Sequence, residues 1–407
     1  MIEKRVKKNS CCGCAACYNV CPVKCIEMRA DSEGFLYPFV NTELCIECGL
    51  CLQVCPFINP GVRVKDPDAY AAINKDEFIR MNSSSGGAFT ALAGQTIRAG
   101  GVVFGAAWDS DWLVSHTYTE TIDGLSAFRG SKYLQSRTGE SYRQAKTFLD
   151  AGREVLYSGT PCQTAGLIRY LKRPYVNLLA VDVVCHGVPS PKVFQARLQE
   201  ILKGQKADQQ SSIEAIQFKS KVAPHCWRNA GFVIKYSDGH LSNEYAEATY
   251  QGVYGQGFLS NLYLRPSCHT CVVKGKKYGS DLTLADFWGV ERVLPDFNNE
   301  KGVSLVFVNS GHGKKALDTT AASCLDVKAI EYDDLSKLCS MFTLSVQPHR
   351  NRAAFFKDFL AGHYSVKELV DRYATKTFRQ KSVSALHQCA HKLGVVHFVR
   401  KMRGSCR

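Results

Sequence analysis

The feature that most constrains the fold is a cysteine motif that occurs twice near the N-terminus. The copies read Cys11-x2-Cys14-x2-Cys17-x3-Cys21-Pro22 and Cys45-x2-Cys48-x2-Cys51-x3-Cys55-Pro56. In this spacing three cysteines bind one 4Fe–4S cluster and the fourth binds its neighbour. Zinc sites, the alternative, use pairs of Cys-x2-4-Cys without the third cysteine and the trailing Cys-Pro. The repeat therefore predicts a small module built around two clusters.

The ligands of these two clusters are expected to cross between the motif copies. One cluster would be bound by Cys11, Cys14, Cys17 and Cys55, and the other by Cys45, Cys48, Cys51 and Cys21. Cys12 could replace Cys11 as the first ligand of the motif, but only Cys11 has two residues between it and Cys14. Cysteines in cluster spacing belong in a reducing compartment, so a cytoplasmic location is expected.

The bulk properties limit the class of protein. A chain of 407 residues is expected to form two or three domains. The formal net charge is +14, but the basic residues are scattered and no nucleic-acid-binding motif occurs, so nucleic acid is not expected as a partner. An acidic protein, a phosphorylated substrate or an anionic membrane surface would suit this charge. No apolar run reaches the ~18 residues of a transmembrane segment, and no secretory signal is present.

The pattern along the chain predicts an α+β ferredoxin-like module, an α/β domain with a mixed sheet that holds flavin and iron–sulfur sites, and a helical C-terminal tail. The corresponding regions are 1–60, 68–150, 151–325 and 333–407. Strands are expected at 34–40, 69–73, 101–107, 112–119, 154–158, 176–184, 213–219, 232–236 and 304–309. The strand at 304–309 is expected to be the last in the chain. Helices are expected at 86–98, 139–151, 161–171 and 191–202.

Cys162 stands directly after an expected strand, in the sequence Ser-Gly-Thr-Pro-Cys-Gln. Thr160 suits the N-cap and Pro161 the first helical position, which places Cys162 in the first turn of a helix. The helix dipole there lowers the pKa of a thiol, so a redox nucleophile is one interpretation of Cys162.

A third cluster is the other interpretation. Two parallel strands that end at one edge of a sheet would bring Cys162 close to Cys185, and a Cys-x2-Cys pair follows in a later loop. The ligands of this third 4Fe–4S cluster would be Cys162, Cys185, Cys268 and Cys271. Buried apolar cysteines beside a small zinc or thiol pair are the remaining alternative.

The sequence Ser84-Ser85-Gly86-Gly87 precedes an expected helix. Serine hydroxyls and glycine amides at a helix N-terminus can hold an anion, so this loop is a candidate for a flavin pyrophosphate, although it could be only a helix start. Neither a nicotinamide fingerprint nor a Walker motif occurs.

Three polar residues are further candidates, each with a structural alternative. Lys132 could pair with a phosphate or an anionic substrate, or be a solvated lysine. Asp286 could contact a ribityl hydroxyl or a flavin nitrogen, or cap a helix. His186 could donate a proton, or be a satisfied histidine at the end of a strand.

Together these segments resemble the beta subunits of coenzyme F420 hydrogenases and dehydrogenases, a family that includes plant 7-hydroxymethyl chlorophyll a reductase. The resemblance lies in Ser-Ser-Gly-Gly at 84–87, Gly-Ser-Lys-Tyr at 130–133, Gly-Thr-Pro-Cys-Gln at 159–163, Cys-His-Gly-Val-Pro at 185–189, Arg-Pro-Ser-Cys-His-Thr-Cys at 265–271 and Asp-Phe-Trp-Gly at 286–289. It implies non-covalent FAD at 84–87 and a 4Fe–4S cluster on the third set of cysteines.

The resemblance implies a reductase that passes electrons from reduced ferredoxin, or a similar low-potential donor, through 4Fe–4S clusters to FAD. An organic substrate would then be reduced, with nucleotide sugars of surface-polysaccharide synthesis as one class. A non-catalytic electron-transfer subunit that serves a separate enzyme is the alternative function. Residues 380–407 are basic and amphipathic, which suits peripheral contact with a membrane or, as the alternative, a helix packed on the domain.

Overall fold

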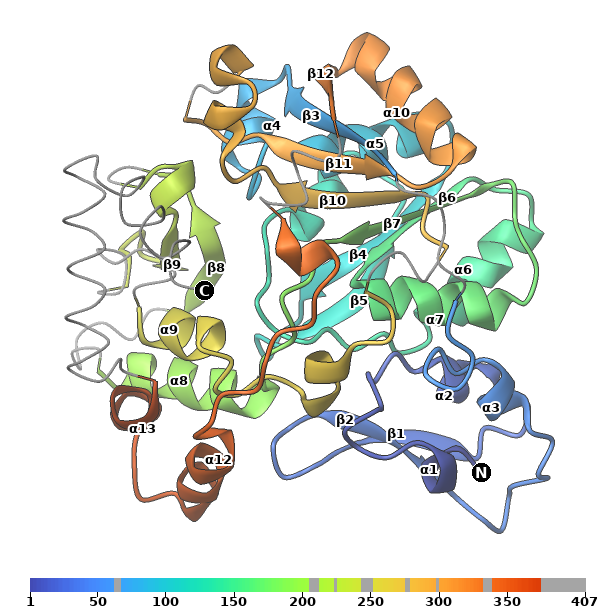
Figure 1. The fold of residues 1–407 in the computed structure, drawn as a ribbon, viewed down its shortest axis with the longest axis vertical. Coiled ribbons are helices and arrows are strands. Elements are labelled where there is room, and N and C mark those ends of the chain that lie inside the picture. The colour runs from blue at the N-terminus through green and yellow to red at the C-terminus, as the bar shows by residue number, and fades with distance from the viewer. Residues whose placement is uncertain are drawn as a thin grey trace, which may run out of the picture.

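A mixed eight-stranded sheet is the centre of the molecule, as the computed structural model shows (Figure 1). From one edge to the other its strands are β12 (Leu325–Ile330), β3 (Asp68–Asn74), β11 (Ser304–Val308), β10 (Leu282–Asp286), β7 (Leu178–Val183), β6 (Val155–Gly159), β4 (Val102–Trp108) and β5 (Val114–Thr119). The structure describes residues 1–61, 67–204, 212–222, 225–242, 252–274, 279–297, 300–331 and 339–374.

Strand direction decides where the candidate residues gather. β10, β7, β6 and β4 are parallel neighbours, and β3 has the same direction because it and β10 both lie antiparallel to β11. β12 and β5 are antiparallel edge strands. The carboxyl ends of β3, β10, β7 and β6 therefore lie along one edge of the sheet, the place where open α/β sheets bind ligands.

Two expectations about strands are corrected by the sheet. No strand was expected within 281–289, but Leu282–Asp286 forms the central strand β10. Its Thr and Asp interrupt the short apolar run that would indicate a buried strand. The segment at 304–309 was expected to be the last strand, but β12 follows. Its exposed polar residues are tolerated because it lies at an edge.

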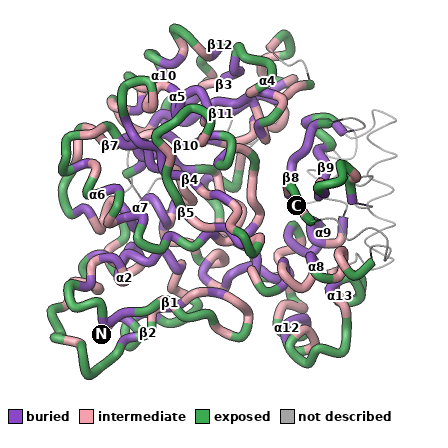
Figure 2. Tube along the Cα trace, turned by 180° about the vertical axis from the view of Figure 1, so that it is seen from behind, coloured by how far each residue is buried: buried purple, intermediate pink, exposed green. Residues whose placement is uncertain are grey.

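Both faces of the sheet are covered by helices. Val103 and Leu156 face α5 (Ala88–Arg98) and α10 (Gly311–Ser323), whereas their neighbours Val102 and Tyr157 face α6 (Ser141–Asp150) and α7 (Pro161–Leu171). This alternation follows from the two-residue period of a strand. The buried residues accordingly run through the sheet and the inner sides of the helices (Figure 2).

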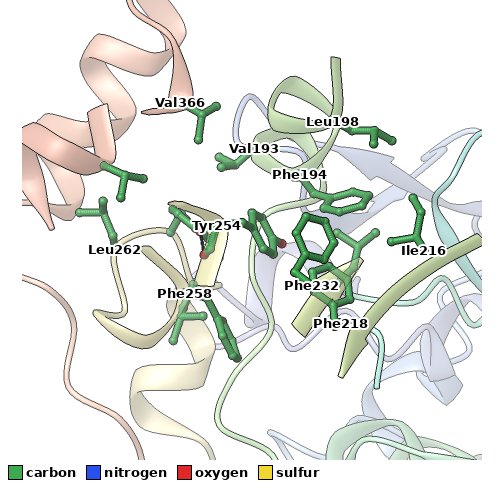
Figure 3. Close-up of a cluster of buried hydrophobic side chains, with 14 of the residues drawn as sticks. Val193, Phe194, Leu198, Ile216, Phe218, Phe232, Tyr254, Phe258, Leu262 and Val366 are labelled. Atoms are coloured by element: carbon green, nitrogen blue, oxygen red, sulfur yellow. Dashed lines mark hydrogen bonds between the residues drawn. The ribbon is translucent and has the colours of Figure 1, made fainter. Parts of the chain in front are cut away.

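A second hydrophobic core lies beside the sheet. It is formed by the hairpin of β8 (Ile213–Ser220) and β9 (Gly231–Tyr236) with α8 (Pro191–Lys203), α9 (Val253–Leu259), α12 (Arg352–Ala361) and α13 (Val366–Tyr373). Figure 3 shows Phe194, Phe218 and Phe232 packed together in this core.

The helical region at 333–407, expected to be a tail, is in part a component of this core. Phe355 and Leu369 are fully buried in it, because α12 and α13 bring an apolar face to α8 and α9. The amphipathic stretch 380–407 lies outside the described residues. Within the described part of the chain, no helix has both the length and the apolar composition needed to cross a bilayer.

The N-terminal module contains the hairpin of β1 (Ile26–Ala30) and β2 (Leu36–Val40) and three short helices, α1 (Ile2–Arg5), α2 (Ala16–Val20) and α3 (Leu50–Gln53). Its small core is made of Ile2, Val6, Ile26 and Val40 together with cysteines. The module lies below the main sheet with α2 next to α7 (Figure 1), and this contact positions the cysteines described below.

Candidate functional site

The first set of cysteines lines one pocket of the N-terminal module. Cys11, Cys14, Cys17 and Cys55 all contribute to its wall, as does Cys12, and the cavity volume is about 20 Å³. Burial raises the pKa of the Cys17 thiol, and the neighbouring thiols of Cys11 and Cys55 raise it further. The structure therefore brings together the crossed set that the motif predicts, with Cys55 joining from the second copy.

The second set lies at the surface of the module. The thiols of Cys45 and Cys48 add to the effect of burial in raising the pKa of Cys51, and Cys48 is exposed to solvent. Cys25 lies beside this set, with its Sγ atom 3.4 Å from that of Cys21 and its N–H donating to the Cys21 sulfur. The sequence offered no ligand pattern for Cys25, which follows Cys21 at a spacing outside the motif.

The third set gathers at the carboxyl edge of the main sheet. Cys162 follows β6 and Cys185 follows the parallel strand β7, so the two loops lie side by side. The N–H of Val188 donates to the Cys268 sulfur at 3.4 Å, which brings the Cys-x2-Cys loop to this edge. Burial and the thiols of Cys268 and Cys271 raise the pKa of Cys185 to about 12.

The environment of Cys162 differs from the one expected for a redox nucleophile. Thr160 caps α7, and its N–H donates to Gln163 Oε1 at 3.0 Å, so Cys162 does lie in the first turn. Its pKa is nevertheless raised well above the usual value, first by its interaction with the thiol of Cys12 and then by burial. These two effects outweigh the helix dipole, which falls off within one turn.

The donor chemistry of all three sets fits 4Fe–4S clusters. Each set consists of thiols alone, and thiolates are the ligands that these clusters use. Among the residues that the structure describes, no three His, Cys, Asp or Glu side chains are arranged to hold a single metal ion. A mononuclear zinc site needs four ligands around one ion, whereas a cube takes one thiolate per iron and spreads its ligands.

The serine loop has the geometry of a tight backbone turn before a helix. Gly87 is the N-cap of α5 with φ +84°. A Cβ on Gly86 would lie 2.3 Å from the carbonyl oxygen of Ala72 and 2.5 Å from the nitrogen of Ser304, so only glycine fits there. Ser85 Oγ donates to the carbonyl of Val303 at 2.7 Å, which fixes the loop on the sheet.

Ser84 faces the segment that carries Lys132. Its Oγ accepts hydrogen bonds from the N–H and the Oγ of Ser131, at 2.6 and 2.9 Å. Lys132 Nζ donates to the carbonyls of Arg129 and Gly130 at 3.1 and 3.4 Å, and burial lowers the pKa of Lys132 to about 7. Within the described residues no carboxylate pairs with Lys132.

Arg129 is a candidate that the sequence did not reveal. Its Nε is buried with no hydrogen-bond partner among the described residues, and burial lowers its pKa. An unpartnered guanidinium nitrogen and a lysine beside the Ser84–Gly87 loop are groups that a pyrophosphate would satisfy. The residues present therefore fit the phosphates of FAD.

Asp286 lies at the end of β10 on the same edge, but its carboxylate is already engaged. It is ion-paired with Lys219, whose side chain is fully buried, and Oδ1 accepts from Trp227 Nε1 at 3.4 Å. The Lys219 ammonium also lies over the ring of Trp288 at 4.9 Å. Asp286 is neither a helix cap nor a free carboxylate in this arrangement, because its oxygens hold Lys219 and Trp227.

His186 is held by two neighbours. Its Nε2 lies 2.7 Å from Asn261 Oδ1, and its Nδ1 lies 3.3 Å from the sulfur of Met341. The Asn261 Nδ2 donates to the carbonyl of Gln347, which turns its oxygen toward the histidine and places the proton on Nε2. Burial lowers the pKa of His186, so a neutral, anchored ring favours the structural role at neutral pH.

Two comparisons with known families match separate parts of the chain. Residues 152–333 match the family described as the C-terminal part of the coenzyme F420 hydrogenase/dehydrogenase beta subunit. Residues 10–59 match the 4Fe-4S dicluster domain.

Two relatives each match a part of the chain. An uncharacterized ferredoxin of Methanocaldococcus jannaschii is 41% identical over 68 residues, which are 16% of this chain and 36% of that protein. One subunit of the F(420)H(2) dehydrogenase of Methanosarcina mazei is 22% identical over 224 residues, 50% of this chain and 63% of that protein. The chain thus spans less than two thirds of the length of either relative.

A solved F420-reducing NiFe hydrogenase complex from Methanosarcina barkeri includes a chain with a TM-score of 0.45 and 19% identity, over 68% of this chain and 89% of that one. The matched families lie where the structure places the N-terminal cysteine sets and the third set. Residues 152–333 therefore belong to the C-terminal family of the coenzyme F420 hydrogenase/dehydrogenase beta subunit, and in this chain they follow an N-terminal 4Fe-4S dicluster domain.

Proposed function

We propose that the protein is a ferredoxin-linked reductase that holds three 4Fe–4S clusters and FAD. One observation carries the proposal: the third set of cysteines and the Ser84–Gly87 loop lie on the same carboxyl edge of one sheet. When bound, the clusters would supply one-electron transfer and the flavin would convert it into two-electron reduction of an organic substrate.

Residues 131–138 connect the Ser84–Gly87 loop to the first set of cysteines. At one end Ser131 contacts Ser84, and at the other end Gln135 Nε2 donates to the carbonyl of Cys12 at 2.9 Å. Thr138 Oγ1 donates to the carbonyl of Cys14 at 3.1 Å. The same backbone therefore positions the proposed phosphate loop and the first set of cysteines, which supports a single redox unit.

The residues around the loop suit an anionic ligand. Arg129 and Lys132 form no ion pair with a carboxylate among the described residues, although Asp76 acts on Arg129 and raises its pKa. Gly86 lets the loop pack directly on the backbone of Ala72 and Ser304, which fixes it beside these two side chains. The acceptor we propose is a small organic molecule, with nucleotide sugars as the first class to test.

The relatives favour a second candidate function. The Methanosarcina mazei relative is by its name one subunit of a larger enzyme, an F(420)H(2) dehydrogenase. A chain of this family could thus pass electrons to a partner protein in place of an organic substrate. Turnover without a partner separates the two functions.

Anaerobic purification tests the proposal directly. We expect iron and sulfide for three 4Fe–4S clusters and one released FAD per chain. Reduced ferredoxin or dithionite should bleach both chromophores. NADPH or NADH alone should not do so, because no nicotinamide fingerprint occurs.

Purified protein with full iron content but no flavin would overturn the proposed reductase function and favour the electron-transfer role. Rapid bleaching by NADH or NADPH would refute the choice of donor.

A further inference from the structure

Cys12, which the cluster motif leaves unused, lies at the contact between the first and third sets. Cys12 lines the same pocket as Cys11 and Cys14, and with Cys14 it packs against the core formed by α6 and α7. Its thiol also raises the pKa of Cys162 in the first turn of α7. Its carbonyl is held by Gln135, so its position does not depend on the thiol alone. Cys12 therefore lies on the side of the first set that faces α7 and Cys162.

The approach of the two sets at this point is built into α7. Cys162 and Gly166 are one turn apart and share a face of that helix. A Cβ on Gly166 would lie 3.0 Å from both Cβ and Sγ of Cys14, so the missing side chain lets Cys14 rest against the helix. Tyr142 closes the same contact from α6, because its hydroxyl would lie 2.8 Å from that Cβ.

A buried arginine ties the two cysteine loops together from the other side. The Arg265 side chain donates to the carbonyls of Cys11 and Leu36 and to Gln135 Oε1, each at 2.8 Å. Its own carbonyl accepts from the N–H of Cys268 at 3.0 Å. One residue thus connects the loop of the first set to the loop of the third.

The second set has no such connection among the contacts of the described residues. It lies on the outer side of the module, where Cys48 is exposed and the N-terminal helix α1 packs next to Cys51. The contacts to the third set come from the loop of the first set.

From these contacts we propose that Cys12 is the junction between the first and third sets. Gln135 holds its carbonyl, Gly166 lets Cys14 approach α7, and Arg265 connects the two loops. This inference rests on the proposed clusters and adds the order of the sets: second outermost, first in the middle, third innermost. With clusters bound, one electron would cross at this junction: the cluster on the first set would be oxidised as the cluster on the third set is reduced, and Cys12 would neither form nor break a bond.

The test compares Cys12→Ala with Cys25→Ala in the full-length protein purified anaerobically. Cys25 is the matched control, because it is also an extra cysteine beside a cluster site but lies next to the second set, away from the junction. Iron content is measured first. Freeze-quench EPR then follows reduction of the third cluster after mixing with reduced ferredoxin, with its signal identified by its loss in Cys268→Ser/Cys271→Ser.

We expect both single variants to keep full iron, and Cys12→Ala alone to slow reduction of the third cluster severalfold. Gly166→Ala should slow it as well, since the added methyl group pushes Cys14 away from α7 while every thiol stays. An unchanged rate in Cys12→Ala would overturn the junction. Loss of one cluster's iron in Cys12→Ala would also overturn it, because Cys12 would then be a ligand.

Failure of the proposed function has a different signature. Wild-type protein that contains three clusters but no flavin would refute the proposed reductase function and leave the junction proposal intact. Wild-type protein without a third cluster would overturn both.

Discussion

Replacing Arg265 with leucine should release the N-terminal module from the α/β domain. The Arg265 side chain is fully buried and makes three hydrogen bonds of 2.8 Å to the first cysteine loop, the hairpin and Gln135. Its guanidinium also lies 4.3 Å from the ring of Tyr37. Leucine has similar apolar bulk but leaves three buried acceptors without a donor.

The size of the effect follows from these contacts. Hydrogen bonds from a charged donor contribute about 1.5–3 kcal/mol each, and the gain is reduced because burying a charge is itself unfavourable. Leaving one buried acceptor without its donor typically costs about 1–3 kcal/mol, so three such acceptors together cost at least about 3 kcal/mol. We expect a loss of that size in the opening free energy of the Cys11–Val20 segment.

Native-state hydrogen exchange of peptides that cover the Cys11–Val20 segment measures this opening free energy, because it reports sub-global opening of a unit. Arg169→Leu is the matched control: its Nη2 makes one exposed hydrogen bond to the carbonyl of Pro60, also near the end of the module. The control should change stability by less than about 0.5 kcal/mol. A change below about 1 kcal/mol in Arg265→Leu would refute the reasoning, because three charged hydrogen bonds cannot be lost at so small a cost.

Three further predictions test other parts of the site. Gly86→Ala should abolish flavin binding and leave the iron content unchanged, because the new Cβ would meet backbone atoms at 2.3 and 2.5 Å. Flavin absorbance and iron assays check this. Gly311→Ala is the control that should have no effect, because a Cβ there has no atom within 4 Å. Cys268→Ser/Cys271→Ser should lose the iron of one cluster and keep the rest, and unchanged iron would disprove the third site. Burial lowers the pKa of Lys132 from 10.5 to about 7, so between these pH values the unfolded chain binds a proton that the folded chain lacks. The free energy of unfolding should therefore rise with pH across that window. Denaturation against pH should show a smaller rise in Lys132→Met, and equal slopes would contradict the lowered pKa.

Local signals in the sequence determined much of this protein. The two cysteine motifs predicted the 4Fe-4S dicluster module, because ligand spacing on a short loop is set by neighbours in the chain. The four cysteines of the predicted crossed set line one pocket. Strand and helix alternation predicted α7 to the residue, since Thr160 and Pro161 mark its start. The parallel strands before Cys162 and Cys185 were also expected, and β6 and β7 pair as such.

The missed elements depend on position in the sheet. β10 was missed because a central strand of five residues carries little periodicity of its own, and β12 because an edge strand tolerates polar residues. The helices α12 and α13 looked like a tail, yet their apolar faces complete a core whose other half is contributed by α8 and α9. Only the packed structure shows which face has a partner.

The junction itself was decided by tertiary structure alone. Cys12 has no ligand spacing, and Arg265 is far from Cys11 along the chain. Their roles arise because α2 packs on α7 and because the loop after β7 meets the Cys268 loop. Sequence spacing fixes which thiols can share a cluster within one loop, whereas the approach of two loops depends on contacts between residues distant in the chain.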